Sequence, residues 1–475
     1  MSWLGHIRSL RTRGSLRGLA RWIFLGTLVA APWLYGATTS WSIELVNGTL
    51  GLALTIWIAS LLLDRRWPMV PRGLVVIAGL ILLQGWWMVA NAHAIYDSTF
   101  RLFTSVRPIF PAAAGSADYV LSFAWMLRAT ALLGVVCLVA ELAQRPVWLL
   151  RLWSTLAIAG GAIATLGLLQ KATGAQMIFW QRASPWEVKT FFATYFYHSN
   201  AGAFLNLVLP VTAGLAVWTV ARNSSPVTRA TWITTVGIIG VAILSNTSRM
   251  AQTVGGLLAL AIAIAVARPA IRFLARSEKR TLVIGSLIVV ATLFAVAQAV
   301  RLDQPLRRWQ ELSDHLPASA RWTANRVALT GIGDAGWFGL GPGAFRAVFP
   351  HYQQASGNQP SGTWRFLHDD YLQTLLEWGW LGSALIAALF FGGVGIGIRS
   401  YLRAKDWSTR QRILLPCVIL ALIAVAIHAA VDFPLQILSI QLFVATYLGI
   451  CWGSGAWARI VPGEDRGLRM EDRKR

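Results

Sequence analysis

The sequence has few charged residues, and acidic residues are the scarcest of these. Only 13% of its 475 residues are charged, with 20 acidic and 42 basic side chains. A water-soluble protein of this size needs a more highly charged surface. Because 56% of the residues are hydrophobic and the mean hydropathy is +0.55, the composition predicts an integral membrane protein.

Cysteine is also scarce. Cys137, Cys417 and Cys451 all lie in apolar runs and form no CxxC motif, so they predict neither a disulfide framework nor a thiolate metal site. The sequence has no Walker A motif, and its basic connections are too short to hold a nucleotide. We therefore do not expect this chain to use ATP itself.

Long apolar runs are what the sequence has in abundance. A membrane-spanning helix needs about 20 apolar residues, and runs of this kind predict about twelve spans: 20–37, 43–63, 71–90, 119–142, 149–170, 201–221, 230–247, 251–267, 281–300, 371–398, 412–431 and 435–457. Runs this long favour helices over barrel strands, which are shorter and alternate in polarity. We predict an all-α polytopic membrane protein with a single integral membrane domain, 1–475, and one large extramembrane loop, 301–370, between spans nine and ten.

The distribution of positive charge predicts the topology. A net charge of +22 is also found in proteins that bind nucleic acid, but here Lys and Arg concentrate in alternate connections, as in cytoplasmic loops. We therefore expect no nucleic-acid partner. We expect both termini in the cytoplasm, the first span retained as an anchor, and the segments 91–118, 171–199 and 301–370 on the outer side.

The large loop carries two recognisable stretches. A connection this long, rich in Trp, Pro and Gly, either carries function or is disordered, and its aromatic residues favour an ordered lid. PASARWTANRVAL, 317–329, predicts an amphipathic helix along the membrane surface. GWFGLGPGAFRAVFPHY, 336–352, has the glycines and proline of a tight turn that brings its backbone close to a partner, which the sequence does not identify.

The stretch HDDYLQTLLEWGWLG places a titratable cluster at the outer end of the tenth span. Asp369 and Asp370 are positioned to cap the first turn of the helix, which leaves His368 just outside it. Asp370, Gln373 and Glu377 are spaced to share one helical face. A carboxylate at bilayer depth is unfavourable by about 2.5–3.5 kcal/mol, so we expect Glu377 to line a cavity or to pair with a cation. A purely structural capping role is the alternative.

Arginines on the same outer side suit a phosphate ligand. Arg249 lies between two closely joined spans, and Arg321, Arg326, Arg346 and Arg365 lie in the large loop. A guanidinium stays charged and binds phosphate oxygens with two parallel hydrogen bonds. The alternatives are a snorkelling role for Arg249 and a solvated surface role for Arg346 and Arg365.

Two further polar pairs lie at the outer ends of spans. His198 and Asn200 begin the span after the segment 171–199. His428 and Asp432 are four residues apart near the end of the eleventh span, a spacing that also suits a mutual hydrogen bond of structural value only.

These motifs, in their order along the chain, resemble the O-antigen ligase and polymerase superfamily of bacterial envelope enzymes, over most of the length. His368 and Asp369, nine residues, Gly379 and then Gly382 are similar to the ligase pattern, although the family has a neutral residue at the position of Asp369. NTSRMA, RWTANR, GLGPGAF and YHSNAGAFLNLVLP are similar to other superfamily motifs, although Asn325 stands where Trp is usual.

The resemblance implies transfer of a glycan from undecaprenyl diphosphate to lipid A core or to a growing glycan, without nucleotide sugar, metal or other cofactor. The reaction would take place on the periplasmic face of the bacterial inner membrane, with membrane lipid as a further partner. Arg249 and Arg321 would bind the diphosphate, with Arg326 as a nearby substitute. His368 would be the general base, oriented by Asp369.

Some of these assignments stay open. In one alternative His368 only hydrogen-bonds the substrate, and Asp369 or Asp370 is the base. The remaining polar residues are candidates to line the acceptor cavity: His198, Asn200, Glu377, His428 and Asp432.

The class of reaction also has alternatives. The His, Gly and Gly pattern favours ligation slightly over polymerisation, and protein O-oligosaccharyltransferases share the architecture. A polytopic transporter would place its polar groups near the bilayer midplane and on broken helices in symmetric positions, whereas here they concentrate at the outer interface. A non-catalytic scaffold in an envelope-assembly complex is a further alternative.

Overall fold

The computed structural model describes residues 3–97, 99–100, 102–182, 190–276, 309–310, 320–357, 359–404 and 407–457. The helices of the first half are α1 (Trp3–Trp33), α2 (Ser40–Leu63), α3 (Arg72–Ala90), α4 (Tyr119–Leu142), α5 (Pro146–Ala172) and α6 (His198–Ala221). Those of the second half are α7 (Pro226–Ser245), α8 (Arg249–Arg276), α12 (Ala320–Ala335), α13 (Phe345–Ala355), α14 (Asp370–Leu402), α15 (Thr409–Ala429) and α16 (Leu438–Ser454).

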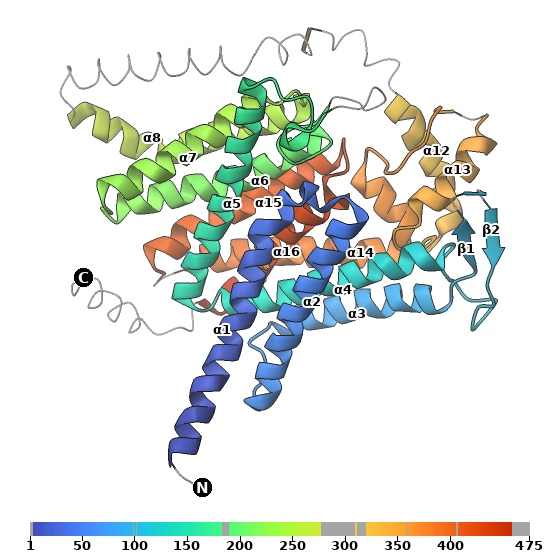
Figure 1. The fold of residues 1–475 in the computed structure, drawn as a ribbon, viewed down its shortest axis with the longest axis horizontal. Coiled ribbons are helices and arrows are strands. Elements are labelled where there is room, and N and C mark those ends of the chain that lie inside the picture. Colours follow the sequence, from blue (N-terminus) through green and yellow to red (C-terminus); the bar gives the residue numbers. More distant parts are fainter. Residues whose placement is uncertain are drawn as a thin grey trace.

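Three short 3₁₀ helices and one small hairpin complete the described structure. The 3₁₀ helices are η1 (Tyr35–Ala37), η2 (Ile178–Trp180) and η3 (Pro434–Gln436). The strands β1 (Ala94–Asp97) and β2 (Leu102–Ser105) pair in antiparallel fashion beside the α12–α13 end of the molecule (Figure 1). The described residues are mostly helical, with only one small hairpin, which confirms the prediction of an all-α protein.

Nine helices of the described residues are long and apolar enough to cross a membrane. They are α2, α3, α4, α5, α6, α7, the Arg249–Ala267 part of α8, α14 and α15, and each corresponds to one predicted span to within a few residues at its ends. Of the other three predicted spans, 20–37 falls mostly in α1, 435–457 corresponds to the shorter apolar helix α16, and 281–300 lies outside the described residues. The count of twelve spans therefore stays a prediction.

Local sequence accounts for where several helices begin. Ser225 accepts a hydrogen bond from the backbone N–H of Thr228 at the start of α7, directly before a proline that suits the first helical turn. Ser408 and Gln411 form a reciprocal capping box at the start of α15. These contacts satisfy backbone donors that the first turn of a helix leaves without partners.

Helix α6 forms the centre of the bundle. Its most apolar window is 83% buried, and it packs against α5, α7, α8 and α15 (Figure 1). Small residues allow this close approach: a Cβ atom on Gly202 would lie 2.2 Å from the Cβ atom of Ala251, and one on Gly160 would lie 2.4 Å from Val208. The polar groups at the start of α6 are therefore held on a rigid element.

The large loop is folded where the structure describes it. Helices α12 and α13 build a second hydrophobic cluster against the first turns of α14, with Val327, Phe345, Phe349 and Leu376 among its buried members. The predicted helix is present and begins at Ala320, whereas 317–319 lie outside the described residues.

Helix α14 is interrupted at Gly379, whose φ of 63° and ψ of −171° are not helical. The interruption leaves backbone carbonyl groups of α14 without their helical partners. Backbone N–H groups of the glycine-rich turn donate hydrogen bonds to these carbonyl groups instead. Leu340 N–H donates to Leu376 O at 2.9 Å, and Gly341 N–H donates to Glu377 O at 3.0 Å. The predicted close backbone approach of the turn is thus found, and its partner is the broken helix.

Two glycines make this contact possible. A Cβ atom on Gly379 would lie 2.4 Å from the backbone nitrogen of Gly339, and one on Gly339 would lie 2.2 Å from the carbonyl oxygen of Glu377. Both residues also have positive φ angles, which other residues adopt only with strain. The interruption fixes the first turns of α14, which carry Gln373 and Glu377, against the folded loop.

Candidate active site

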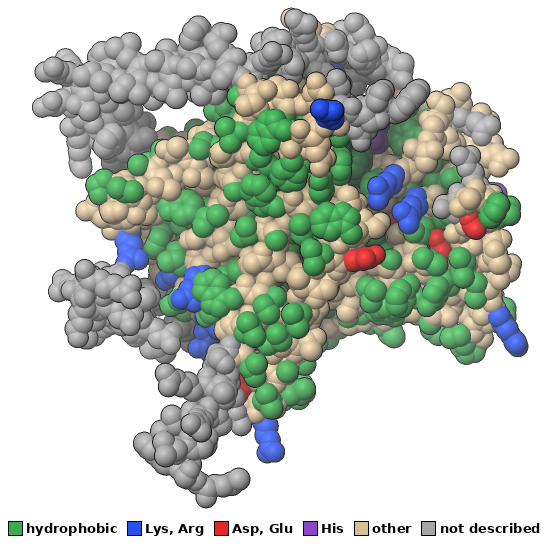
Figure 2. All heavy atoms as spheres, in the orientation of Figure 1, with side chains coloured by type: hydrophobic (Ala, Val, Ile, Leu, Met, Phe, Trp, Pro, Cys, Tyr) green, Lys and Arg blue, Asp and Glu red, His purple; other side chains and the backbone are tan. Residues whose placement is uncertain are grey.

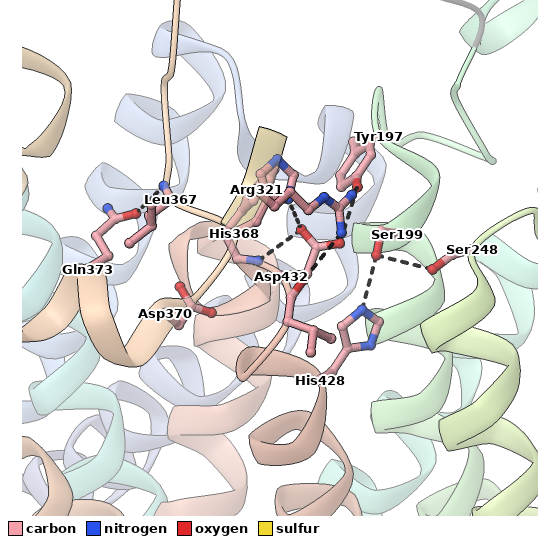
Figure 3. Close-up of polar contacts among 12 residues, drawn as sticks. Tyr197, Ser199, Ser248, Arg321, Leu367, His368, Asp370, Gln373, His428 and Asp432 are labelled. Carbon is pink, nitrogen blue, oxygen red and sulfur yellow. Dashed lines mark hydrogen bonds and ion pairs between the residues drawn. The ribbon is translucent and has the colours of Figure 1, made fainter. Parts of the chain in front are cut away.

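Asp432 is the centre of a polar network where the beginnings of α6, α12 and α14 meet the end of α15. It lies between α15 and η3, and it is 2% exposed. Its Oδ1 atom accepts a hydrogen bond from Nδ1 of His368 at 2.9 Å, and its Oδ2 atom accepts one from the hydroxyl of Tyr197 at 3.2 Å (Figure 3). A buried carboxylate of this kind requires such partners.

Arg321 of α12 joins the same network through Tyr197. One guanidinium nitrogen donates to the Tyr197 hydroxyl at 2.8 Å, and the other donates to the carbonyl of Val431 at 3.3 Å (Figure 3). The structure therefore brings together His368, the predicted base, and Arg321, a predicted phosphate ligand. Tyr197 and Asp432 lie between them.

The electrostatics of the network keep Asp432 ionised. Burial alone would raise the pKa of this carboxyl group, but the hydrogen bond and charge of His368 and the charge of Arg321 more than offset burial. The pKa of Asp432 therefore lies below its ordinary value. The opposite holds for Tyr197, whose pKa is raised by burial and by the neighbouring Asp432 charge, so its hydroxyl stays a proton donor.

His428 does not pair with Asp432 in the way that their spacing suggested. Helix α15 ends at Ala429, so the four-residue register that would bring the two side chains together is lost. His428 is buried, and its Nε2 atom lies 3.1 Å from the hydroxyl of Ser199, which also accepts a hydrogen bond from Ser248 at 3.2 Å (Figure 3).

The two aspartates next to His368 have structural partners. Asp369 accepts hydrogen bonds from the backbone N–H groups of Tyr371 and Leu372, as predicted for a cap. Asp370 is 1% exposed, and its two oxygens accept from the backbone N–H of Leu435 and the amide of Gln436, each at 2.8 Å. The carboxylate that contacts His368 is Asp432 rather than the adjacent Asp369.

The predicted polar stripe of α14 faces protein. Gln373 donates to Glu377 Oε1 at 3.0 Å and accepts from the backbone N–H of Leu367 at 2.9 Å, while Glu377 Oε1 also accepts from the backbone N–H of Phe345 at 3.2 Å. The stripe therefore ties both ends of the folded loop to α14. Gln373 and Glu377 also line the cavity described next.

A cavity of about 720 Å³ lies next to His368, which is one of its lining residues. Its walls come from α2, α4, the start of α6, α13, the loop before α14, and η3, and they include Tyr197, Asn200, His368, Gln373 and Glu377. His198 is buried at the start of α6, with its Nδ1 atom 3.1 Å from the carbonyl of Thr190, and does not line the cavity.

The cavity continues into an apolar slot. This slot, of about 860 Å³, is lined by α2, α3 and α4, and three residues line both spaces: Glu44, Asn47 and Leu127. It follows α2 from Glu44 to Ile58 and reaches Pro68 beyond the end of that helix. The slot and the cavity therefore adjoin at these three residues, and apolar groups make up most of the lining of both.

The other two predicted phosphate ligands, Arg249 and Arg326, lie outside the cavity wall. Arg249 is half-buried at the first residue of α8, directly after Ser248. Arg326 is exposed and stands about 140° around α12 from Arg321, since an α-helix has about 3.6 residues per turn. Neither side chain lines the cavity.

Comparison with known proteins now adds to this geometry. The model of a family described as O-antigen ligase matches residues 227–387. The resemblance to the O-antigen ligase superfamily is confirmed. No curated protein matches the chain. The match supports a membrane glycosyltransferase of the O-antigen ligase and polymerase superfamily.

The O-antigen ligase match contains Arg249, Arg321 and His368, whereas Tyr197 and Asp432 lie outside it. The sequence predicts no role for Tyr197, and it places Asp432 only among the candidates to line the acceptor cavity. Two signals pointed to Tyr197: it stands directly before His198 at a helix start, and it is the first residue of the motif YHSNAGAFLNLVLP.

Proposed function

We propose that the protein transfers a glycan from undecaprenyl diphosphate to an acceptor hydroxyl at the outer face of the bacterial inner membrane. One observation carries this proposal: His368 and Arg321 converge on Asp432 and Tyr197, beside a cavity that a lipid chain can reach. A base for the acceptor and a cation for the leaving group are then parts of one rigid network.

His368 acts as the general base in this proposal. Its Nδ1–H donates to Asp432, so Nε2 is the nitrogen left for an acceptor hydroxyl, and no other described residue hydrogen-bonds it. The acceptor oxygen gives its proton to Nε2 and forms a bond to the anomeric carbon. Asp432 stabilises the imidazolium that results.

The leaving group is the lipid diphosphate. As the new bond forms, the bond between the anomeric carbon and the phosphate oxygen breaks, and its electron pair stays on the diphosphate. Arg321 and Arg249 stabilise this developing negative charge, which is the largest electrostatic requirement of the step. A single displacement of this kind inverts the anomeric configuration.

The geometry favours His368 over the adjacent aspartates as base. Asp369 is occupied with capping α14, and both oxygens of Asp370 accept hydrogen bonds in a buried position. An acid so engaged is poorly placed to take a proton from a substrate.

Ligation to lipid A core is the activity we favour, because the matching family is described as O-antigen ligase. Polymerisation of O-antigen or exopolysaccharide and protein O-oligosaccharyl transfer use the same donor chemistry and remain alternatives. Mass spectrometry of surface glycans in a strain that lacks the protein separates them: uncapped core, single-repeat core or unglycosylated protein accumulates, respectively.

A transfer assay with purified protein in detergent tests the catalytic proposal. We expect the wild-type chain to move glycan from undecaprenyl diphosphate to acceptor without a membrane gradient, which a transporter does not do. His368→Gln and Arg321→Gln should each lower the rate at least about 100-fold. Arg107→Gln, an exposed arginine of the outer loop outside both cavities, is the matched control. Near-full transfer by both site variants would refute the assignment.

A further inference from the structure

A cluster of arginines and tryptophans lies at the end of the bundle opposite to the candidate active site. The cavity beside His368 is lined by the beginnings of α2 and α4, whereas the cluster lies where α1 and α5 meet the far ends of these two helices. We call it the arginine–tryptophan cluster, and its members are Arg21, Trp22, Arg145, Trp148 and Arg151. Figure 2 shows basic and apolar side chains next to one another where the start of α5 meets α1.

Two guanidinium groups of the cluster share one indole ring. The guanidinium carbon of Arg21 lies 5.0 Å from the ring centroid of Trp148, and that of Arg151 lies 4.7 Å from the same centroid. Arg151 is also 5.1 Å from the ring of Trp22, and the two indole rings meet edge to face with their centroids 5.5 Å apart. A guanidinium that lies over an aromatic ring keeps the N–H groups in its own plane available for an anion.

The acidic side chains next to the cluster already have basic partners. Asp64, directly after α2, forms an ion pair with Arg17 of α1 at 2.5 Å. Glu141, in the last turn of α4, is 2% exposed and forms an ion pair with Arg66. A buried carboxylate requires a partner of this kind, so neither acid is left to neutralise a further arginine.

The arginines of the cluster therefore carry a surplus of positive charge. Among the residues that the structure describes, no ion pair joins Arg21, Arg145 or Arg151 to an acidic side chain. Glu141 attracts Arg21 over a longer distance, but three neighbouring arginines oppose this attraction. Five arginines against two acids leave a net charge of +3 at this place. Like charges that are held together in this way favour an anion between them.

Apolar positions continue from the cluster along α1 and α5 toward the middle of these helices. Trp22 is 54% exposed, and Gly26, one turn further along the same face of α1, is exposed as well. Ile158, two turns beyond Arg151 on α5, is 53% exposed. A Cβ atom on Gly26 would meet no other atom within 4 Å. An apolar chain can therefore pack here while a charged group lies on the arginines.

We propose that the arginine–tryptophan cluster binds an anionic phospholipid, with the phosphate between Arg21 and Arg151 and the acyl chains beside Gly26. Basic pockets between membrane-spanning helices bind such headgroups. Because the surplus of positive charge repels an ammonium group, the site selects headgroups without an amine. The inference is independent of glycan transfer, since no member of the cluster lines the cavity beside His368.

The alternative account is that these arginines only set the topology of the chain. Lys and Arg in short connections do this wherever they stand, and Trp is common at both membrane surfaces. Such a role requires neither a shared indole ring nor a preference for one headgroup over another. A headgroup preference that depends on Arg21 and Arg151 therefore distinguishes a binding site from a topology signal.

Native mass spectrometry of the full-length protein in detergent tests the proposal. The probes are phosphatidylglycerol, phosphatidylethanolamine and glycerol 3-phosphate. We expect wild type to bind phosphatidylglycerol at least about 10-fold more tightly than phosphatidylethanolamine. In the double variant Arg21→Gln with Arg151→Gln, binding of phosphatidylglycerol should weaken about 10- to 100-fold and the preference should disappear, because two charged hydrogen-bonding groups are removed.

A second double variant controls for loss of charge. Arg222→Gln with Arg229→Gln removes two positive charges from the region where α6 ends and α7 begins, including an arginine that lies over Trp218 at 5.5 Å. We expect this variant to bind phosphatidylglycerol as wild type does. Arg151 is exposed, so Arg151→Gln alone supplies the test if the first double variant does not fold.

A glycine variant tests the place of the acyl chains. Gly26→Leu should weaken binding of long-chain phosphatidylglycerol and leave the binding of its dihexanoyl form unchanged, because the added side chain fills the open space beside α1. Gly237→Leu, at an exposed and open position of α7, is the matched control and should change neither.

Three results would overturn the inference. The first is that wild type binds phosphatidylethanolamine as tightly as phosphatidylglycerol. The second is that both double arginine variants lose the same affinity, which assigns the effect to overall charge. The third is that glycerol 3-phosphate displaces phosphatidylglycerol at equal concentration, which makes the cluster a site for a soluble phosphate rather than for a lipid.

Discussion

The Nδ1 atom of His368 lies 2.9 Å from Oδ1 of Asp432, a residue 64 positions later in the chain. Asp432 is almost fully buried and ionised, so it holds the imidazole in one tautomer and one orientation. The pair has the arrangement expected of a base and the group that positions it.

Asp432→Asn is expected to lower the turnover number of glycan transfer by about 100-fold or more, because the imidazolium formed in the reaction loses its counter-charge. The donor KM should change much less. Asp369→Asn should cause only a small loss, since Asn caps a helix about as well as Asp. Steady-state kinetics of the two purified variants decide the matter: equal losses would mean that Asp432 has no special relation to His368.

The depressed pKa of Asp432 also predicts how stability depends on pH. A carboxyl group whose pKa is lower in the folded protein than in the unfolded chain stabilises the fold above its unfolded value, about 3.9 for Asp. That contribution is lost as the pH falls below this value. The unfolding temperature in detergent should therefore fall more steeply between pH 5 and pH 3 for wild type than for Asp432→Asn. Parallel curves would contradict the prediction.

The network around His368 shows what a single sequence can and cannot predict. Asp370, Gln373 and Glu377 share a helical face because their spacing lies within one helix, and local periodicity was enough to find them. The contact between His368 and Asp432 depends on how α14 and α15 pack, and no local pattern encodes that. The expected pairing of His428 with Asp432 failed for a related reason, because the helix that would impose it ends at Ala429.

The same distinction applies to the fold. Span positions follow from composition, since each hydrocarbon-crossing helix must be long and apolar. The break in α14 was not predicted, although the glycine-rich turn predicts a close approach of its own backbone to an unspecified partner. In the sequence, Gly379 is only one of several glycines in an apolar run. The need for glycine at this position arises from the contact with Gly339, which lies in a different element.

We predict that Tyr197 holds Arg321 in position relative to the pair of His368 and Asp432. Its hydroxyl accepts from Arg321 and donates to Asp432, so Tyr197→Phe removes both hydrogen bonds and leaves the ring packed against Phe433 at 5.4 Å between centroids. Loss of one hydrogen bond to a charged group corresponds to about a 10-fold effect or somewhat more. We expect the donor KM to rise by about this factor. Unchanged donor kinetics, with normal unfolding temperature, would show that Arg321 needs no such support.

The interruption of α14 gives the strongest stability prediction. Gly379→Ala should prevent stable folding or lower the unfolding temperature by many degrees. Its φ of 63° with ψ of −171° is accessible almost only to glycine, and the new Cβ atom would lie 2.4 Å from the nitrogen of Gly339. Gly395→Ala, in the regular part of the same helix with no atom within 4 Å, should be neutral or stabilise by about 0.4–1 kcal/mol. Thermal unfolding in detergent compares the two variants. Equal stability would mean that the turn and the helix do not meet as described, and the first turns of α14 would then have no fixed position for His368.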